Sequence, residues 1–395
     1  MLRLFVRALA ILMCLGAMPV GAFAQSADDA NIVVAQRINR APTAAAVGES
    51  DVRERINSWT VGMAAGLPEG TYLHVAAEIA RNVNESKSGD ELRLLPVVTP
   101  GATENVRDLL YLKGIDIAIT ATDVFEHFRT IEKIRNIEKR VHYISALYVS
   151  EVHLLVRPEI KSIKDLEGKK VSLHTKGSGS TVTGPIVFRT LGVKVEPVYI
   201  SNAIALEKMK TGEIAGLIHN GGKPNPLLTR FKNTEGFHFI EIPFDRFDEF
   251  YVPGVLSSKE YPNFLKPGEK VETIGVPAVL AVYNWPTQSD RYRRVSRFID
   301  HFFDRFERFK GPGYRGLWKD VNLAAQVPGW TRFAAAEEKL KEVMGAQAAA
   351  PKIDTELARQ QAARVAPGDP AEQERLFQRF LEWAKKQNAR QTANR

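Results

Sequence analysis

Glycines and small hydroxyl residues are concentrated between Gly177 and Thr181, after a short apolar run and before a helical pattern. A loop that curls around a small anion needs glycines, which let backbone N–H groups turn inward, and a nearby helix N-terminus, whose dipole favours negative charge. Gly177, Ser178, Gly179, Ser180 and Thr181 offer both features. The same composition is typical of an ordinary β–α turn, so this stretch alone leaves both interpretations open.

Polar turns also follow the other predicted strands. In an open α/β sheet the carboxyl ends of the strands form the rim where ligands bind, so we expect these turns to converge. The alternative is that each hydroxyl or carboxylate in these turns caps a helix, and that Lys223 is exposed to solvent and binds no ligand. The candidate ligand-binding residues in these turns are Thr71, Tyr72, Thr99, Ala102, Thr103, Thr120, Thr122, Asn220, Gly221, Gly222 and Lys223.

Motifs for catalysis are missing from the sequence. The 177–181 stretch lacks the lysine of a phosphate-binding P-loop and does not match the Gly-x-Ser-x-Gly turn of serine hydrolases. The eight histidines show no zinc-ligand spacing. We therefore expect a protein that is not an enzyme and that uses no metal and no cofactor.

The N-terminus predicts a secretory signal peptide over residues 1–24. Arg3 and Arg7 precede an apolar stretch that is too short for a stable membrane span, and Ala22-Phe23-Ala24 resembles a cleavage site. A retained N-terminal anchor is the alternative. The sole cysteine, Cys14, lies inside this segment, so the mature chain is expected to have no disulfide.

The composition is that of a globular protein with room for two lobes. The chain has 395 residues, 44% of them hydrophobic and 25% charged, with a formal charge of +8. Removal of the two N-terminal arginines leaves 8 − 2 = +6. Acidic and basic residues alternate throughout the chain, which argues against a nucleic-acid partner.

Strand-like and helix-like patterns alternate along the chain, which predicts an α/β fold with a mixed sheet covered on both faces. The expected strands include residues 57–66, 93–98, 115–120, 152–157, 195–200, 214–218 and 271–283. A helix over 202–210 and a long helix over 288–310 with a core-facing aromatic stripe are also expected. Gly184-Pro185 favours a helix that begins at Pro185 and leaves a longer loop before it.

The ordered combination of VVTPGATENVRDL, DIAITATDV, KKVSLHTKGSGS, GEIAGLIHNGGKPNP and TIGVPAVLAVYN resembles the TAXI family of solute-binding proteins. That family serves tripartite ATP-independent periplasmic (TRAP) transporters. The similarity covers about residues 58–344. The chain departs from the family at Ile119-Thr-Ala-Thr122, so the side chains that contact the ligand are expected to differ there.

The resemblance implies a two-lobed type II periplasmic-binding-protein fold, with a mixed sheet in each lobe and two interlobe crossings. The implied lobes are lobe 1 (55–150 and 275–345) and lobe 2 (151–274). The signal peptide (1–24), a flexible leader (25–54) and a partly helical C-terminal extension (346–395) are predicted from composition and pattern, and the resemblance explains neither the leader nor the extension. It also implies a periplasmic receptor that closes on a small organic anion, an amino acid or carboxylate, and presents it to the membrane subunits of a TRAP-type transporter. A sensor that docks on a membrane receptor or histidine kinase is the alternative. Neither role calls for stable membrane insertion.

Overall fold

The computed structural model describes residues 48–85, 91–247, 251–344 and 355–393. The predicted signal peptide, and the part of the predicted leader before residue 48, lie outside these residues. The last part of that leader is helical, because α1 spans Glu49–Ser58. The strand predicted from residue 57 is correspondingly shorter and spans Thr60–Ala64.

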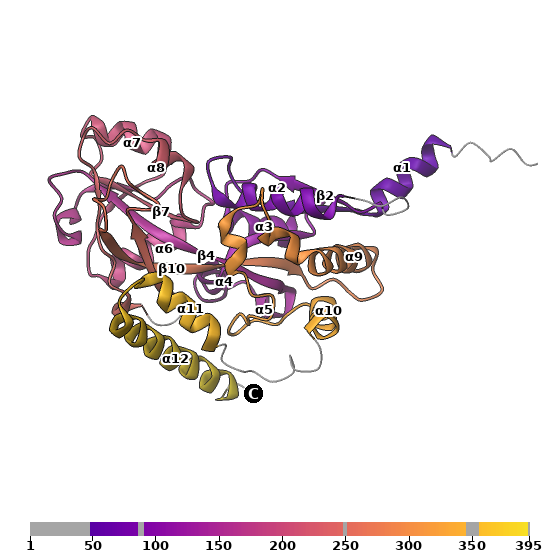
Figure 1. The fold of residues 1–395 in the computed structure, drawn as a ribbon. Coiled ribbons are helices and arrows are strands. Elements are labelled where there is room, and N and C mark those ends of the chain that lie inside the picture. The colour runs from indigo at the N-terminus through magenta and orange to yellow at the C-terminus, as the bar shows by residue number, and fades with distance from the viewer. Residues whose placement is uncertain (1–47, 86–90, 248–250, 345–354, 394–395) are drawn as a thin grey trace, which may run out of the picture. The chain divides into compact units, whose positions relative to one another are not determined.

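The strands form one ten-stranded mixed sheet in the order β2-β1-β3-β10-β4-β7-β5-β6, with β8 beside β4 and β9 beside β10 (Figure 1). Strands β1, β2 and β3 run parallel to one another, and so do β5, β6 and β7. The strands are β1 (Thr60–Ala64), β2 (Arg93–Val97), β3 (Ile117–Ala121), β4 (Val141–Val156), β5 (Lys170–Ser172), β6 (Glu196–Val198), β7 (Gly216–Gly221), β8 (His238–Phe239), β9 (Val252–Ser257) and β10 (Lys270–Tyr283).

Two long antiparallel strands join the two halves of the sheet. Strand β4 pairs with β10 up to Glu151 and with β7 from Glu151 onward. Strand β10 pairs with β9 up to Gly275 and with β3 from Ala278 onward. We call the β1–β3 side lobe 1 and the β5–β9 side lobe 2. The predicted fold class, a two-lobed mixed α/β fold with two crossing strands, is confirmed, whereas the predicted domain limits stay predictions.

Most helices follow strands and cover the sheet, as expected when strands are buried on both faces. They are α1 (Glu49–Ser58), α2 (Thr71–Val83), α3 (Ala102–Tyr111), α4 (Thr122–Thr130), α5 (Ile137–Arg140), α6 (Ser180–Thr190), α7 (Asn202–Lys210), α8 (Pro226–Arg230), α9 (Asp290–Asp304), α10 (Ala334–Met344), α11 (Thr355–Val365) and α12 (Pro370–Ala393). Short 3₁₀ segments lie at η1 (Ile163–Leu166), η2 (Phe244–Arg246), η3 (Phe306–Lys310) and η4 (Gly316–Asp320).

The predicted long helix over 288–310 is divided in two. Helix α9 ends at Asp304, and η3 continues after Arg305, whose guanidinium donates to the carbonyl oxygens of Asn82 and Val83 at the end of α2. The aromatic stripe lies in the core as predicted. Phe302 and Phe309 are buried, and the Phe309 ring stacks on Trp318 with 4.2 Å between centroids.

The prediction that a helix begins at Pro185 is wrong. Helix α6 begins at Ser180 and includes Pro185. Tertiary contacts hold the first turn, because Ser180 Oγ accepts from the Asn220 N–H at 2.9 Å and Thr183 Oγ1 donates to Asp123 Oδ2 at 2.6 Å. These contacts offset the missing N–H of the proline.

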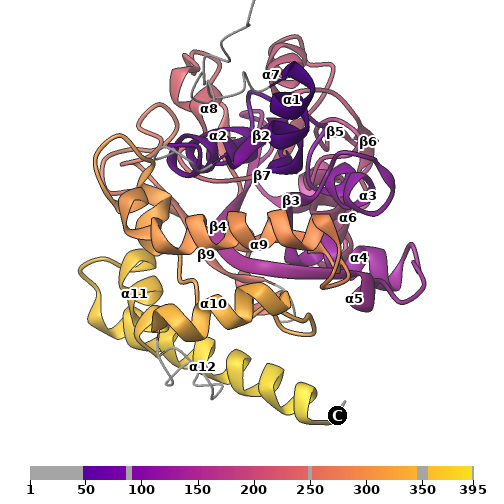
Figure 2. The same ribbon diagram turned by 90° about the vertical axis from the view of Figure 1, so that its right-hand side faces the viewer.

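The C-terminal helices α11 and α12 form a hairpin (Figure 2). The hairpin has a small apolar core of its own. Phe377 and Leu376 of α12 pack against alanines of α11. The hairpin contacts both lobes, since Arg364 pairs with Asp320 in η4 and the Arg379 guanidinium lies 5.7 Å from the Phe244 ring centroid.

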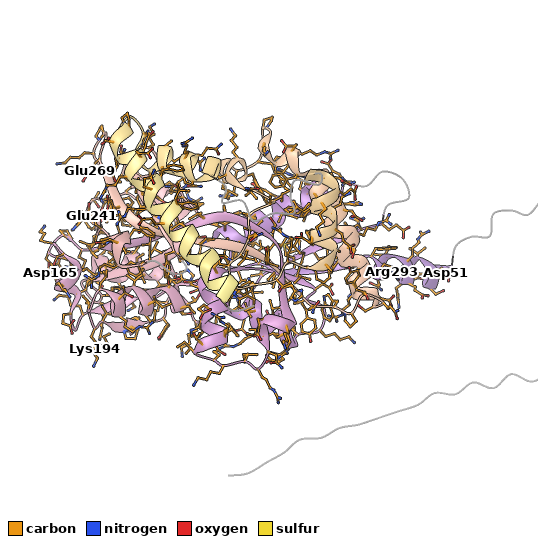
Figure 3. All side chains as sticks on the ribbon, turned by 90° about the horizontal axis from the view of Figure 1, so that it is seen from below. Asp51, Asp165, Lys194, Glu241, Glu269 and Arg293 are labelled. Atoms are coloured by element: carbon orange, nitrogen blue, oxygen red, sulfur yellow. The ribbon has the colours of Figure 1, made fainter. Side chains whose placement is uncertain are left out.

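Charged side chains of both signs lie on the surface. Asp165, Lys194, Glu269 and Arg293 are exposed examples (Figure 3). Among the described residues, no helix combines the length and the apolar character that a membrane span requires.

Candidate functional site

Three helices begin at one small cavity between the lobes. Helices α2 and α3 come from lobe 1 and α6 comes from lobe 2, and their N-cap residues are Gly70, Gly101 and Gly179. A glycine has no side-chain oxygen to cap the first-turn N–H groups. In α3 the N–H groups of Thr103 and Glu104 bond to the Gly177 carbonyl oxygen, and in α6 the Thr181 N–H bonds to the Ser178 carbonyl oxygen. Each helix N-terminus also carries a partial positive charge of roughly half an elementary charge.

The cavity has a volume of about 50 Å³. A single water needs about 10–15 Å³ on this kind of measure, so the space suits a group of only a few non-hydrogen atoms. Eight of the predicted ligand-binding residues line it, from both lobes: Thr71, Tyr72, Ala102, Ser178, Gly179, Ser180, Asn220 and Gly221. Their ligand-binding role stays a prediction.

Hydrogen bonds across the cleft hold the lobes together next to this cavity. The Gly177 carbonyl oxygen of lobe 2 accepts from the N–H groups of Thr103 (2.9 Å) and Glu104 (3.1 Å) at the start of α3. Thr103 Oγ1 donates to the Ser178 carbonyl at 3.1 Å, and the Gly222 N–H donates to Thr71 Oγ1 at 3.1 Å. Thr103 and Gly222 therefore join the lobes in this arrangement.

Other predicted site residues have partners within the protein. Thr99 Oγ1 donates to Asn105, Thr120 Oγ1 donates to the Ala102 carbonyl at 3.0 Å, and Thr181 Oγ1 donates to the Ser178 carbonyl at 2.7 Å. These three hydroxyls donate to oxygen atoms of the protein, and none of these bonds caps a helix N–H group; their ligand-binding role stays a prediction.

Two further predicted residues lie apart from the cavity wall. Thr122 is the buried first residue of α4. Lys223, predicted as a cation for the ligand, pairs instead with Glu151 at 3.1 Å and donates to the Val255 carbonyl. The lysine faces a different cavity, because the chain turns away from the small cavity after Gly221.

Three polar atoms at the small cavity are buried and have no hydrogen-bond partner among the described residues. They are Ser178 Oγ, Asn220 Oδ1 and His174 Nε2. Ser178 and His174 are 7% and 5% exposed. A buried polar group without a partner costs about 1–3 kcal/mol, so a ligand that pairs with these atoms would regain that energy.

His174 and His219 were missed by the sequence analysis, which considered the histidines only as zinc ligands. Both line the cavity, and a third buried histidine, His153, lies behind His219 with 5.8 Å between ring centroids. Among the described residues, no group of three or more potential ligand side chains is arranged to hold a metal ion. The three rings of this row are hydrogen-bonded to other residues of the protein.

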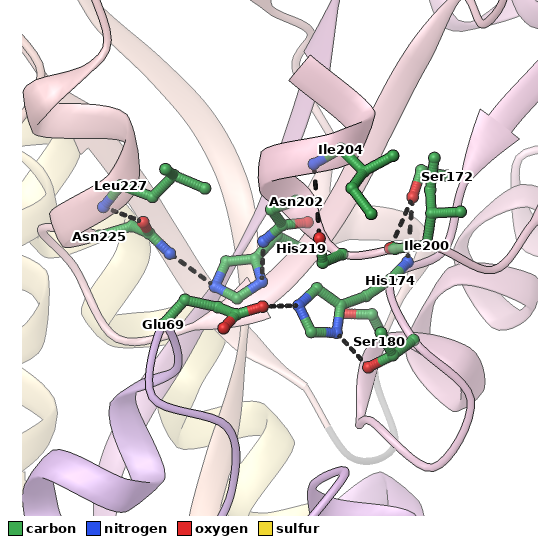
Figure 4. A network of polar contacts seen from close by, with 12 residues as sticks. Glu69, Ser172, His174, Ser180, Ile200, Asn202, Ile204, His219, Asn225 and Leu227 are labelled. Atoms are coloured by element: carbon green, nitrogen blue, oxygen red, sulfur yellow. Dashed lines mark hydrogen bonds and ion pairs between the residues drawn. The ribbon is translucent and has the colours of Figure 1, made fainter. Parts of the chain in front are cut away.

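The partners of His219 define its tautomer. Asn225 Oδ1 accepts from the Leu227 N–H, so its amide NH₂ donates to His219 Nε2 at 2.9 Å (Figure 4). His219 Nδ1 must then carry the hydrogen and donate to the amide of Asn202, 3.0 Å away. This assignment turns the Asn202 oxygen toward the ring and gives a partner to an oxygen otherwise left unpaired. Burial holds the pKa of His219 well below its usual value, which agrees with a neutral ring.

Asp123 makes a titratable contact between the lobes. Its carboxylate on α4 accepts from Thr183 Oγ1 of α6 and faces the Tyr251 hydroxyl at 3.4 Å. Burial raises the pKa of Asp123 to about 6, and the hydrogen bond from Thr183 acts in the opposite direction.

A much larger cavity of about 1220 Å³ lies among lobe 2, η4 and the C-terminal hairpin. Two ion pairs lie in its wall, Lys223 with Glu151 and Arg364 with Asp320. The small cavity is the better candidate site because three helix N-termini with glycine at the N-cap meet three unpaired polar atoms there.

The chain is similar to known proteins in sequence and in structure. Residues 63–300, more than half of the chain, match the model of the NMT1-like family. The periplasmic aliphatic sulphonate binding protein SsuA from Escherichia coli is 14% identical, with a TM-score of 0.41 over 82% of this chain and 92% of that chain. The BvgS periplasmic domain of B. pertussis is 10% identical, with a TM-score of 0.36 over 64% of this chain and 42% of that chain. Likenesses this distant say nothing about the ligand of the present chain.

Proposed function

The chain belongs to the NMT1-like family, and from that premise we propose that it is a periplasmic solute-binding receptor that closes its lobes on a small organic anion. The observation that carries this proposal is the convergence of three glycine-capped helix N-termini on one cavity. Backbone N–H groups and helix dipoles favour an anion there without a lysine or arginine in the wall.

The proposed mechanism is closure of the cleft. An anion enters between the lobes and accepts hydrogen bonds from the start of α6 and from Ser178. Lobe 1 then covers it with α2 and α3, and the contacts of Gly177 with Thr103 and Glu104 hold the closed state. The crossing strands β4 and β10 would absorb the rotation. No residue needs to act on the ligand chemically, so we propose a binding protein and not an enzyme.

The proposed partner is the membrane part of a TRAP-type transporter, with the chain as a TAXI-type member of the family. The predicted signal peptide supports a periplasmic location. A sensor role would use the same closure, and reconstitution with the transporter subunits would separate the two roles, since only transport produces ligand uptake into vesicles.

The test of ligand binding is a thermal-shift screen of the ligand-stripped mature protein against carboxylates of increasing size, amino acids, phosphate esters and matched neutral amides. A ligand at one hundred times its Kd stabilises the protein by about 2.7 kcal/mol. We expect small carboxylates to stabilise the protein and neutral amides of the same size to have a smaller effect. An equal response to anions and amides would refute the proposed anion site.

Ser178→Ala is the matching variant, because it removes a buried, unpaired hydroxyl at the cavity. We expect a loss of affinity of about tenfold, the value of roughly one hydrogen bond to a charged group. Ser296→Ala on α9, whose hydroxyl donates to the Tyr292 carbonyl at 2.9 Å, is the control and should leave the affinity unchanged.

A further inference from the structure

His174 is held toward the cavity by its backbone. It follows β5 in lobe 2 with φ at +65°, a left-handed conformation that is uncommon for a residue with a side chain. Such strain persists only where the surrounding structure imposes it, and it is concentrated at ligand sites. The side chain is 7% exposed, and its Nε2 has no hydrogen-bond partner among the described residues.

The other two histidines of the row have both ring nitrogens engaged. His219 contacts Asn202 and Asn225, and His153 contacts the Glu151 carbonyl (2.9 Å) and the Tyr261 hydroxyl (2.7 Å). Within the row, His174 is therefore the ring with a nitrogen available to a ligand.

The groups that face His174 define its electrostatic surroundings. Glu69 of lobe 1 approaches from across the cleft, with Oε1 4.0 Å from Nε2 (Figure 4). The neutral His219 ring lies 5.8 Å away on β7, and Thr175 Oγ1 contacts Nδ1 at 3.1 Å. Lys176 is turned toward the Tyr199 ring. Among the described residues of the cavity wall there is no lysine or arginine.

Burial lowers the pKa of His174, while the Glu69 carboxylate acts in the opposite direction. With the cavity lacking an anion, the ring is neutral at neutral pH. An anion beside Nε2 would reverse this preference, because a negative charge at close range stabilises the imidazolium.

We propose that His174 takes up one proton when an anion binds in this cavity, and so supplies the positive charge that the cavity wall lacks. The inference rests on the proposed function, since it needs an anion at this site. The proton comes from solvent and adds to the ring, so that Nε2–H faces the anion and Glu69 while Nδ1–H donates to Thr175 Oγ1.

The consequence is a coupling between binding and pH. Linkage requires that an anion whose binding takes up one proton binds more tightly as pH falls, by up to tenfold per pH unit. A neutral molecule of the same shape gains nothing from the proton. His174 would thus select for charge and adjust affinity to the acidity of the compartment.

The experiment is calorimetric titration of the mature protein with propanoate at pH 7 in bis-Tris and in imidazole, two amine buffers whose buffering species are neutral or cationic and which are adjusted to the same chloride concentration. The difference in observed enthalpy, divided by the difference in buffer ionisation enthalpy, gives the protons taken up. We expect an uptake approaching one proton for propanoate and none for propanamide, the neutral isostere.

Four variants assign the proton. His174→Asn should abolish the uptake, and asparagine tolerates the left-handed backbone at this position. Glu69→Gln leaves the fold of lobe 2 untouched and should move the uptake to lower pH. His238→Asn on β8, outside the cavity, and Asp123→Asn, which removes the other interlobe carboxyl, should both retain the uptake.

The outcomes separate the two proposals. Propanoate binding without proton uptake, or with uptake that survives His174→Asn, overturns the role of His174 and leaves the anion receptor standing. Absence of any propanoate binding between pH 6 and 8 overturns the inference together with a small-carboxylate site.

Discussion

Adding one methyl group at Gly177 should prevent full closure of the cleft. A Cβ at this position would lie 2.7 Å from the Pro100 Cβ of lobe 1. Carbon atoms are comfortable at about 3.5–4.0 Å, so the lobes must separate by about 1 Å. The bonds from Thr103 and Glu104 to the Gly177 oxygen, at 2.9 and 3.1 Å, would stretch to about 4 Å and be lost.

The expected cost to the closed state is about 2 kcal/mol, from two hydrogen bonds of about 1 kcal/mol each. Because binding requires closure, Gly177→Ala should weaken propanoate binding by about 30-fold. The substitution also places alanine at φ +88°, which costs about 1–2 kcal/mol of folding stability by itself.

Gly268→Ala is the matched control. Gly268 has φ +83° and no atom within 4 Å of the added Cβ, so it has the same backbone cost without the interlobe clash. Both variants should lose similar folding stability in urea, and only Gly177→Ala should lose affinity. Since the sole cysteine lies in the predicted signal peptide, labels at Lys113→Cys and Lys194→Cys can report the opening by energy transfer. Equal affinity in the two glycine variants would refute this reasoning.

Three further predictions concern stability. Asp116→Ala leaves Arg294 without its buried partner at 3.0 Å and the Gly62 N–H without its acceptor. The free energy of unfolding measured in urea should therefore fall by about 3–5 kcal/mol. A decrease of less than about 1 kcal/mol would contradict this. The pKa of Asp123 is raised to about 6 in the folded protein, above 3.8 for the unfolded chain. Its contribution to the free energy of unfolding is therefore complete below about pH 4 and is lost as pH rises through 6. Asp123→Asn should therefore flatten the free energy of unfolding between pH 4 and 7, and an unchanged slope would exclude this carboxyl. Phe377→Ala should destabilise the α11–α12 hairpin by about 3 kcal/mol, because it removes the aromatic ring from the hairpin core. Amide exchange should become faster in the hairpin and stay unchanged in β3. Unchanged amide protection of the hairpin would mean that it does not depend on this ring.

Hydrophobic periodicity predicted those elements whose structure is determined by the local sequence. Helix α7 has the predicted limits, 202–210, and the aromatic stripe of α9 lies in the core. Strand β4 was predicted only over 152–157, because its first ten residues gain their strand partners from β10, more than one hundred residues later in the chain. Such long-range pairing leaves no local signal.

The candidate site was predictable in its backbone and not in its side chains. The glycine-rich loop over 177–181 was predicted to precede a helix, although α6 begins at Ser180 and not at Pro185 as predicted. The contacts of Lys223 with Glu151 and of Thr103 with Ser178 depend on how the lobes meet, which no local spacing encodes. His174 acquires its role from a left-handed backbone and from Glu69 on the other lobe.

Lobe 2 is one continuous segment of the chain between the two crossing strands, so it can be replaced as a unit. The chain leaves lobe 1 through β4 and returns through β10, where Val149 pairs with Pro277 in antiparallel register. Neighbouring strands lie about 4.8 Å apart, a gap that a two-residue turn can close. A shortened chain that joins these strands directly would keep β1–β3 with their covering helices. Lobe 2 could thus be exchanged as one uninterrupted gene segment, with lobe 1 retained unchanged.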